Sequence, residues 1–239
     1  MKSSLSFLAV LTAVHSLVAA PVEGVVRLTG TPPPEIPIQM DTACAAAQKV
    51  PPTTRHYVVS KEGGLANVFV VVRVGVPARA YPVPSEPAVM ECIACQVYPH
   101  VIAVRTNQPI EFHNNSGFME NLHLTPKSKS NREGNFALMS GGKPAKFTFD
   151  QSEDFIRLKG DVHEWWFAYV CVVDHPFFAV TGADGAFRLP DGLPDGTYAL
   201  EATHLKAGKA RHQINVRDGR ADRIEIQLSV PQKNPRSLR

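Results

Sequence analysis

Apolar residues recur along the chain in short runs that either alternate with polar residues or form β-branched blocks, as β-strands require. The predicted strands are Val25–Leu28, Arg55–Val59, Asn67–Val74, Val101–Arg105, Ile110–His113, Lys146–Phe149, Phe155–Leu158, Phe167–Val173, Phe178–Thr181, Ala186–Leu189, Thr197–Ala202, Arg211–Val216 and Arg223–Leu228. Glycine-containing turns separate many of them, and no long helical pattern intervenes. The pattern therefore predicts an all-β fold built of sandwiches.

Two segments interrupt this rhythm of strands. Residues 31–54 are rich in Pro and Ala and predict an irregular connection anchored by Cys44, with one helical turn near Ala45–Lys49. Residues 126–145 are polar and contain Gly141-Gly142, which is typical of a surface loop. The tail at 231–239 is expected to be a frayed end.

The first twenty residues have the pattern of a secretory signal peptide. Lys2 supplies a positive charge, Leu5 to Val18 are mostly apolar, and small residues end the segment at Ala20. Cleavage after Ala20 would leave an exported protein, periplasmic or extracellular. No later stretch has the length of a transmembrane helix, so no membrane-spanning segment is expected.

Composition and motifs narrow the functional classes. The 239-residue chain is 44% apolar and 20% charged, which is typical of a globular protein. Its formal net charge of +3 comes from scattered basic residues and gives no reason to expect nucleic-acid binding. No nucleophile elbow, phosphate loop or zinc-protease helix is present, so no enzymatic activity is predicted.

Export changes the interpretation of the four cysteines. An even set in an oxidising compartment predicts two disulfides, and four cysteines allow three pairings. We favour Cys44–Cys95 together with Cys92–Cys171. A redox or metal-binding Cys92-x-x-Cys95 pair is the alternative, but such pairs usually lie at a helix N-terminus, which the sequence does not provide here.

Two short segments carry the candidate chemistry. Residues 114–122 read Asn-Asn-Ser-Gly-Phe-Met-Glu-Asn-Leu, and residues 160–166 read Gly-Asp-Val-His-Glu-Trp-Trp. The first resembles the plastocyanin pattern Asn-Asn-Ala-Gly-Phe-Pro-His-Asn-Val, with Glu120 at the position of the copper-binding His. The second resembles the Cys-x-x-His-x-x-Met ligand loop of the same cupredoxin family. Gly160 then stands at the Cys position, His163 keeps the His, and Trp166 takes the Met position.

This resemblance implies a cupredoxin-like sandwich with a degenerate copper site. Blue copper needs two His, one Cys and a weak axial Met, of which only His163 is kept. Cys171 lies eight residues beyond His163 on a predicted strand, so it is not expected to replace the missing thiolate. We therefore expect no sulfur donor beside His163.

Weaker metal binding at the same place is a second hypothesis. Glu120 and His163 could hold copper or zinc. Along an extended strand Glu120, Leu122 and Leu124 share one face, which places His123 on the other and makes it a less suitable third ligand. An ordinary polar pair between Glu120 and His163 is the favoured interpretation, with no cofactor.

The aromatic run Trp165, Trp166 and Phe167 is the candidate binding surface, since exposed aromatic residues often mark interaction sites. Packing of one or two of them into the core is the alternative interpretation. Trp166 in particular is expected to fill the space of the lost metal and Met, because a void there would be costly.

The remaining strands resemble a second family. Phe178-Ala-Val-Thr-Gly-Ala-Asp-Gly-Ala-Phe-Arg-Leu and then Asp191-Gly-Leu-Pro-Asp-Gly-Thr-Tyr-Ala-Leu look like a carboxypeptidase regulatory-like, transthyretin-like sandwich. Residues 21–76 and 176–230 would form it, with a cupredoxin-like domain at 77–175 inserted between its halves. The whole order is similar to a group of bacterial exported proteins that combine the two modules.

Together these features predict an exported, non-enzymatic binding or scaffold protein that contacts an unknown protein or cell-envelope partner. A periplasmic copper- or zinc-binding protein is the first alternative. A carbohydrate- or envelope-binding module is the second, and it depends only on the aromatic residues.

Overall fold

The computed structural model describes residues 22–218 and 220–232, so the predicted signal peptide and residues 233–239 of the tail lie outside the described residues. The described chain contains strands and one short helix, which confirms the all-β class. The elements are β1 Glu23–Thr29, α1 Thr42–Ala46, β2 Phe69–Val74, β3 Ala88–Ile93, β4 Gln96–Tyr98, β5 Val101–Arg105, β6 Ile110–Asn115, β7 Glu120–Thr125, β8 Gly134–Leu138, β9 Ala145–Phe147, β10 Glu153–Lys159, β11 Phe167–Val173, β12 Phe178–Val180, β13 Ala186–Arg188, β14 Gly196–His204, β15 Gly208–Val216 and β16 Ile224–Ser229.

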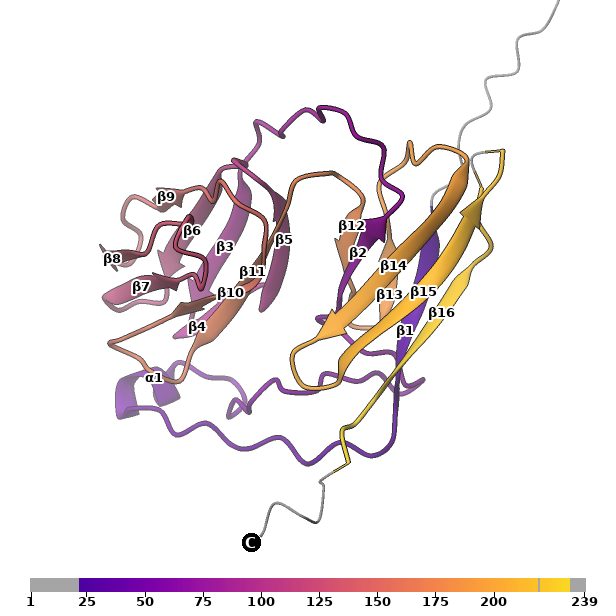
Figure 1. Cartoon of the computed structure of the whole chain (residues 1–239). Helices are drawn as coiled ribbons and strands as arrows, with labels where there is room; N and C mark the ends of the chain where they lie inside the picture. Colours follow the sequence, from indigo (N-terminus) through magenta and orange to yellow (C-terminus); the bar gives the residue numbers. More distant parts are fainter. Residues whose placement is uncertain (1–21, 219, 233–239) are drawn as a thin grey trace, which may run out of the picture.

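The strands form two sandwiches that lie side by side (Figure 1). The outer sandwich, on the right of the figure, has a three-stranded sheet in the order β13-β1-β16 and a four-stranded sheet in the order β12-β2-β14-β15. The inner sandwich has a five-stranded sheet in the order β5-β11-β10-β7-β8 and a four-stranded sheet in the order β4-β3-β6-β9. Both ends of the described chain belong to the outer sandwich.

Two central strands explain how the sandwiches pack together. Along β2, Val70 and Val72 face the core of the outer sandwich, while Phe69 and Val71 face a separate apolar cluster. That cluster also contains Cys171 and Val173 of β11, whose alternate residues face the inner core. A strand buried on both faces has a continuous apolar run in place of alternation. The two least alternating segments of the sequence therefore form the contact between the sandwiches.

Within the described residues, two links join strands of one sandwich directly to strands of the other, and one buried arginine is bonded to both links. Arg105 is only 5% exposed. Its guanidinium donates to the carbonyl oxygens of Tyr81 and Pro82 at 3.3 and 3.1 Å and to that of Asp174 at 2.8 Å. The link from β2 to β3 is thereby bonded to the link from β11 to β12.

A long irregular segment, residues 30–59, passes beneath both sandwiches and carries α1 at its far end (Figure 1). We call it the strap. The helical turn predicted near Ala45–Lys49 is present but begins earlier, because the Asp41 side chain accepts the Cys44 N–H at 2.8 Å and caps it. The strand predicted at Arg55–Val59 is not formed. The carboxylate of Glu35 accepts the N–H groups of residues 56 and 57 and takes the place of a strand partner.

Four observed strands, β3, β4, β7 and β8, are absent from the predicted strands, although residues 120–124 were considered as an extended segment. β8 pairs with the edge of β7 inside the segment that the sequence predicted as a loop. Its side chains are mostly exposed or half-buried, as is common for an edge strand, so its sequence gives little apolar signal. β3 and β4 are joined by a two-residue turn at Ala94 and Cys95, both with positive φ (48° and 57°), where Asn-Gly would be the recognisable pattern.

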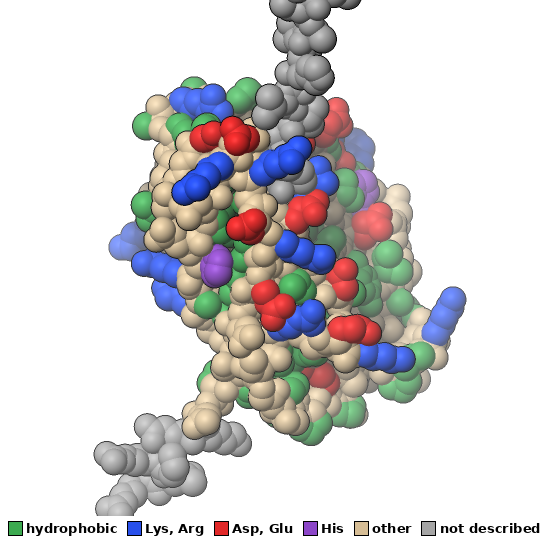
Figure 2. All heavy atoms as spheres, turned by 90° about the vertical axis from the view of Figure 1, so that its right-hand side faces the viewer, with side chains coloured by type: hydrophobic (Ala, Val, Ile, Leu, Met, Phe, Trp, Pro, Cys, Tyr) green, Lys and Arg blue, Asp and Glu red, His purple; other side chains and the backbone are tan. Residues whose placement is uncertain are grey.

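Figure 2 shows the face of the outer sandwich over β15 and β16, where lysine and arginine are interspersed with aspartate and glutamate. On β16 exposed and buried residues alternate strictly, with Ile224, Ile226 and Leu228 in the core. This face therefore carries no single-sign patch of the kind that binds nucleic acid. Among the described helices none has the length and apolarity needed to cross a membrane.

The identity of the outer sandwich as transthyretin-like stays a prediction. Its core is built from residues 22–72 and 177–228, and the inner core from residues 90–172. Whether the chain divides into two separately folding domains at 77 and 175 also stays a prediction.

Candidate functional site

Glu120 begins β7 at the end of the inner sandwich nearest the strap. On this strand Glu120, Leu122 and Leu124 are buried, as strict alternation predicts. Glu120 itself is 0% exposed, which requires partners for its carboxylate because an unpaired buried charge is costly.

Three side chains meet this carboxylate. His163 Nδ1 lies 2.8 Å from Glu120 Oε2, and the indole N–H of Trp166 donates to the same oxygen at 3.1 Å. The Cys92 thiol donates to Oε1 at 3.7 Å. Burial first, and then Glu120, raise the pKa of Cys92, so this thiol stays protonated. The polar pair expected between Glu120 and His163 is therefore present inside a larger buried cluster.

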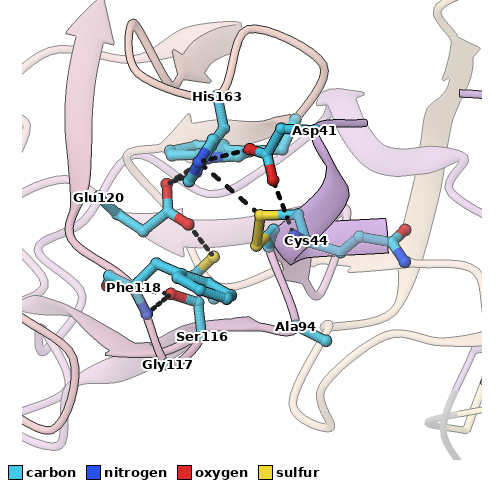
Figure 3. The surroundings of a disulfide bond; sticks show 12 residues. Asp41, Cys44, Ala94, Ser116, Gly117, Phe118, Glu120 and His163 are labelled. Atoms are coloured by element: carbon cyan, nitrogen blue, oxygen red, sulfur yellow. Dashed lines mark hydrogen bonds and ion pairs between the residues drawn. A yellow bond between two sulfur atoms is a disulfide. The ribbon is translucent and has the colours of Figure 1, made fainter. Parts of the chain in front are cut away.

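The second nitrogen of His163 faces the strap. Its Nε2 lies 3.3 Å from Asp41 Oδ2 and 3.7 Å from Cys44 Sγ. Figure 3 shows the imidazole between Glu120 on one side and Asp41 with Cys44 on the other. The ring of Trp165 stacks on that of His163 with centroids 4.8 Å apart, and its indole N–H donates to the Cys95 carbonyl.

One of the two predicted disulfides is present in the structure, and the other is not. Cys44 and Cys95 form a disulfide with a Cα–Cα distance of 5.9 Å, which confirms the first pair. The second predicted pair is wrong, because Cys92 and Cys171 are buried free thiols. Cys92 faces the inner core, whereas Cys171 lies on the face of β11 that packs against the outer sandwich. The five-stranded sheet separates them.

The residues at positions 160 and 166 do not fit a type 1 copper ion. A Cβ atom at Gly160 would lie 2.7 Å from the Trp166 indole and 2.8 Å from the His163 carbonyl oxygen, so the indole occupies the space of a side chain at 160. Trp166 is 2% exposed and stacks on Phe112 at 5.8 Å between centroids. Glycine at 160 and tryptophan at 166 thus depend on each other, because a larger residue at 160 would collide with the indole.

One expectation about this site needs correction. No sulfur donor was expected beside His163, yet Cys44 Sγ lies 3.7 Å from its Nε2. Cys44 reaches the site from the strap, 119 residues away in sequence. Cys44, Cys95 and His163 are all buried, and their ligand atoms lie within 4.8 Å of one another. Asp41 and Cys92 were also missed; only the Asp-x-x-Cys spacing of a helix cap was visible for Asp41.

His123 lies outside this cluster. Its Nδ1 is 2.9 Å from Asp161 and its Nε2 is 2.7 Å from Glu133, on the opposite face of β7 from Glu120. Hydrogen bonds from Lys159 and then from His123 and Asn121 lower the pKa of Asp161 to about 2. His123 therefore belongs to a separate polar group at the edge of the sheet.

Of the three aromatic residues predicted to form a binding surface, one is buried in the core and two are half-buried. Trp166 is buried and cannot contact a partner, which corrects its assignment to the binding surface. Trp165 and Phe167 are half-buried and line a groove of about 380 Å³ together with Pro37 and Ile38 of the strap.

A second hollow of about 180 Å³ shares Arg55, His100 and Phe167 with the first and extends between the two sandwiches. We call the two together the inter-sandwich groove. Its permanent charges are mostly positive, since Arg55, Arg157 and Lys206 line it with one acidic residue, Glu164.

Two histidines that line this groove, His100 and His204, add no charge at neutral pH. Burial, and then the nearby Arg55, lower the pKa of His100 to about 3. Burial and Lys206 lower the pKa of His204 to about 4. The Nδ1 atom of His100 is buried and has no hydrogen-bond partner among the described residues.

No protein family matches the chain, and no curated protein matches it in sequence. Similar solved structures include a copper-containing nitrite reductase from Thermus scotoductus SA-01, at 13% identity and a TM-score of 0.35 over 42% of this chain. The chain spans only 26% of that reductase. A purple cupredoxin from Nitrosopumilus maritimus matches at 13% identity and a TM-score of 0.31, over 36% of this chain and 99% of its own. An oxidised amicyanin variant matches at 13% identity and a TM-score of 0.32, over 44% and 98%. These are similarities of fold, and each covers less than half of this chain.

Proposed function

We propose that the protein is an exported, non-enzymatic binding protein in which the copper position of a cupredoxin-like sandwich has become a structural polar cluster. The observation that carries this proposal is the placement of Trp166. Its ring fills the space at Gly160 and its N–H donates to Glu120, at the position of the lost His. The same residues that prevent copper ligation stabilise one another.

Restoring the ligands should restore the metal centre. In the triple variant Glu120→His, Gly160→Cys and Trp166→Met, we expect one Cu²⁺ per chain and the intense visible absorption of a copper–thiolate bond. The native protein should show no such band. Gly160→Cys alone should also fail, because Trp166 still fills the site. The measurement is a copper titration followed by absorption and electron paramagnetic resonance.

This experiment separates the proposal from its alternative. A blue copper spectrum from the native chain would overturn the proposal. If the triple variant folds, as judged by circular dichroism, but its copper spectrum is no different from that of the native chain, positions 120, 160, 163 and 166 do not correspond to a cupredoxin ligand set.

The inter-sandwich groove is the proposed binding surface. Its aromatic side chains and its net positive charge suit a partner segment that presents acidic side chains beside apolar ones. The guanidinium of Arg157 lies over the Phe167 ring, 5.2 Å from its centroid, and is exposed, so it is placed to meet such a partner.

Peptide binding can be followed through Trp165, since the other tryptophan, Trp166, is buried. We expect an Asp- and Phe-containing peptide to change the Trp fluorescence, with an affinity that falls as salt is raised. Arg157→Ala should weaken binding several-fold, whereas Arg188→Ala removes the same charge outside the groove and should not. A response to neutral oligosaccharides alone would instead favour the carbohydrate-binding alternative.

A further inference from the structure

We propose that reduction of the Cys44–Cys95 disulfide opens a zinc site formed by both cysteines, His163 and Asp41. This site goes beyond the binding function proposed above and shares only His163 with the lost copper position. Its ligands come from the strap, the β3–β4 turn and the loop between β10 and β11, so it would join three segments of the chain.

Two distances from His163 Nε2, to Cys44 Sγ and to Asp41 Oδ2, already agree with the spacing of ligands around a tetrahedral zinc ion. Zinc binds Cys sulfur at about 2.3 Å and His nitrogen or carboxylate oxygen at about 2.0–2.1 Å, so tetrahedral geometry separates sulfur from nitrogen by about 3.6 Å and nitrogen from oxygen by about 3.3 Å. His163 Nε2 lies 3.7 Å from Cys44 Sγ and 3.3 Å from Asp41 Oδ2. The two sulfurs must move from bonding distance to about 3.8 Å apart. Asp41 lies outside the group of ligand atoms within 4.8 Å of one another, so its carboxylate must also move towards the sulfurs.

The orientation of His163 supports ligation through Nε2. Metal-bound histidines usually donate their other N–H to a carboxylate, which fixes the tautomer and strengthens the ligand. Glu120 provides this carboxylate at 2.8 Å from Nδ1. The stacked Trp165 ring limits rotation of the imidazole. Glu120, which replaces a copper ligand in the resemblance, would here be a positioning residue.

The Asp41 carboxylate is also oriented by a hydrogen bond. Its Oδ1 accepts the Cys44 N–H at 2.8 Å, which leaves Oδ2 directed at His163 (Figure 3). The Asp41 side chain is 47% exposed, whereas both sulfurs and the imidazole are buried. The ion would therefore have three buried ligands and one on the solvent side.

The chemistry balances with a dithiol reductant. The reductant gives two electrons and two protons to the Cys44–Cys95 bond, producing two thiols, and is itself oxidised to a disulfide. Zn²⁺ then displaces both thiol protons to solvent and is bound by two thiolates. Exchange with a disulfide-containing oxidant would reverse the step: the two thiolates lose two electrons and re-form the Cys44–Cys95 bond, the oxidant takes up these electrons and two protons to become a dithiol, and Zn²⁺ is released. The oxidation state of the pair would thus control whether the strap is held by a covalent bond or by a metal.

The test is zinc binding by the full chain in its two oxidation states. We expect the reduced protein, freed of reductant, to bind one Zn²⁺ in competition with a chromophoric chelator, and the oxidised protein to bind at least 100-fold more weakly. Co²⁺ in place of Zn²⁺ should give sulfur-to-metal charge-transfer bands in the reduced native protein, a readout that needs no variant.

Matched variants locate the site. Cys44→Ser, Cys95→Ser and His163→Ala should each abolish tight binding, whereas His123→Ala and Cys92→Ser should retain it. Glu120→Gln should weaken zinc binding about 10–100-fold without removing the cobalt charge-transfer bands, as expected for a group that acts through His163.

Three outcomes would overturn the inference: no zinc bound by the reduced chain, equal binding by the oxidised chain, or tight binding that survives in His163→Ala. None of them bears on the copper-ligand reconstruction described above, so the two proposals can fail separately.

Discussion

Replacing both Cys44 and Cys95 by serine should lower the free energy of unfolding by roughly 4 kcal/mol, because the disulfide closes a loop with a sequence separation of 51. The cross-link restricts the unfolded chain, and its removal restores that conformational freedom. In the folded protein it also fixes α1 to the β3–β4 turn. We expect the loss to appear as a lower denaturant midpoint in chemical unfolding under non-reducing conditions.

Reduction provides the control. With a reductant and a chelator present, the native protein and the double variant should unfold at similar denaturant concentrations, since neither then has a cross-link. The strap should exchange its amide hydrogens faster in the variant than in the oxidised native protein. A stability loss below about 1 kcal/mol under oxidising conditions would show that the strap is held by its other contacts.

Glu120→Ala should have a similarly large effect, about 3–5 kcal/mol, since it removes one partner of a buried charged cluster. The carboxylate is 0% exposed, and its loss leaves the Trp166 indole, the Cys92 thiol and His163 Nδ1 without their acceptor. A cavity beside the Trp166 ring adds to the cost. Equilibrium unfolding of the oxidised protein measures the change.

Two further substitutions show whether burial is the reason. Glu120→Gln keeps the shape and an acceptor oxygen, so it should cost clearly less than Glu120→Ala. Glu133→Ala removes an exposed glutamate that also contacts a histidine, His123, and should change stability by less than about 1 kcal/mol. Equal losses for Glu120→Ala and Glu133→Ala would contradict the structural role given to the buried cluster.

The sequence predicted the fold well wherever a strand carried its own apolar pattern. β5 and β11 were predicted with their observed bounds, and β7 has the alternation expected for Glu120, Leu122 and Leu124. It failed where partners outside the segment decide the structure. β8 is an edge strand whose pattern is polar, and the Arg55–Val59 segment has apolar residues but is bonded to the side chain of Glu35.

The site was predicted to the extent that it is local in sequence. The spacing within residues 114–122 and 160–166 brought Glu120 and His163 together, and the structure places them 2.8 Å apart. The other side of the imidazole could not be predicted, because Asp41 and Cys44 come from an irregular segment without periodicity. The same limit explains the incorrect Cys92–Cys171 pair, since the two faces of a sheet cannot be assigned from cysteine spacing alone.

The hydrogen bonds of Arg105 to both links between the sandwiches have a consequence for recognition. Because the links are bonded to each other and the sandwiches share an apolar cluster, the walls of the groove are preformed. A protein that need not reorganise loses little conformational entropy when a ligand arrives, so most of the entropic cost falls on the ligand. For the peptide binding proposed at this groove, we therefore expect stiff partners to bind more tightly than flexible ones of the same chemistry.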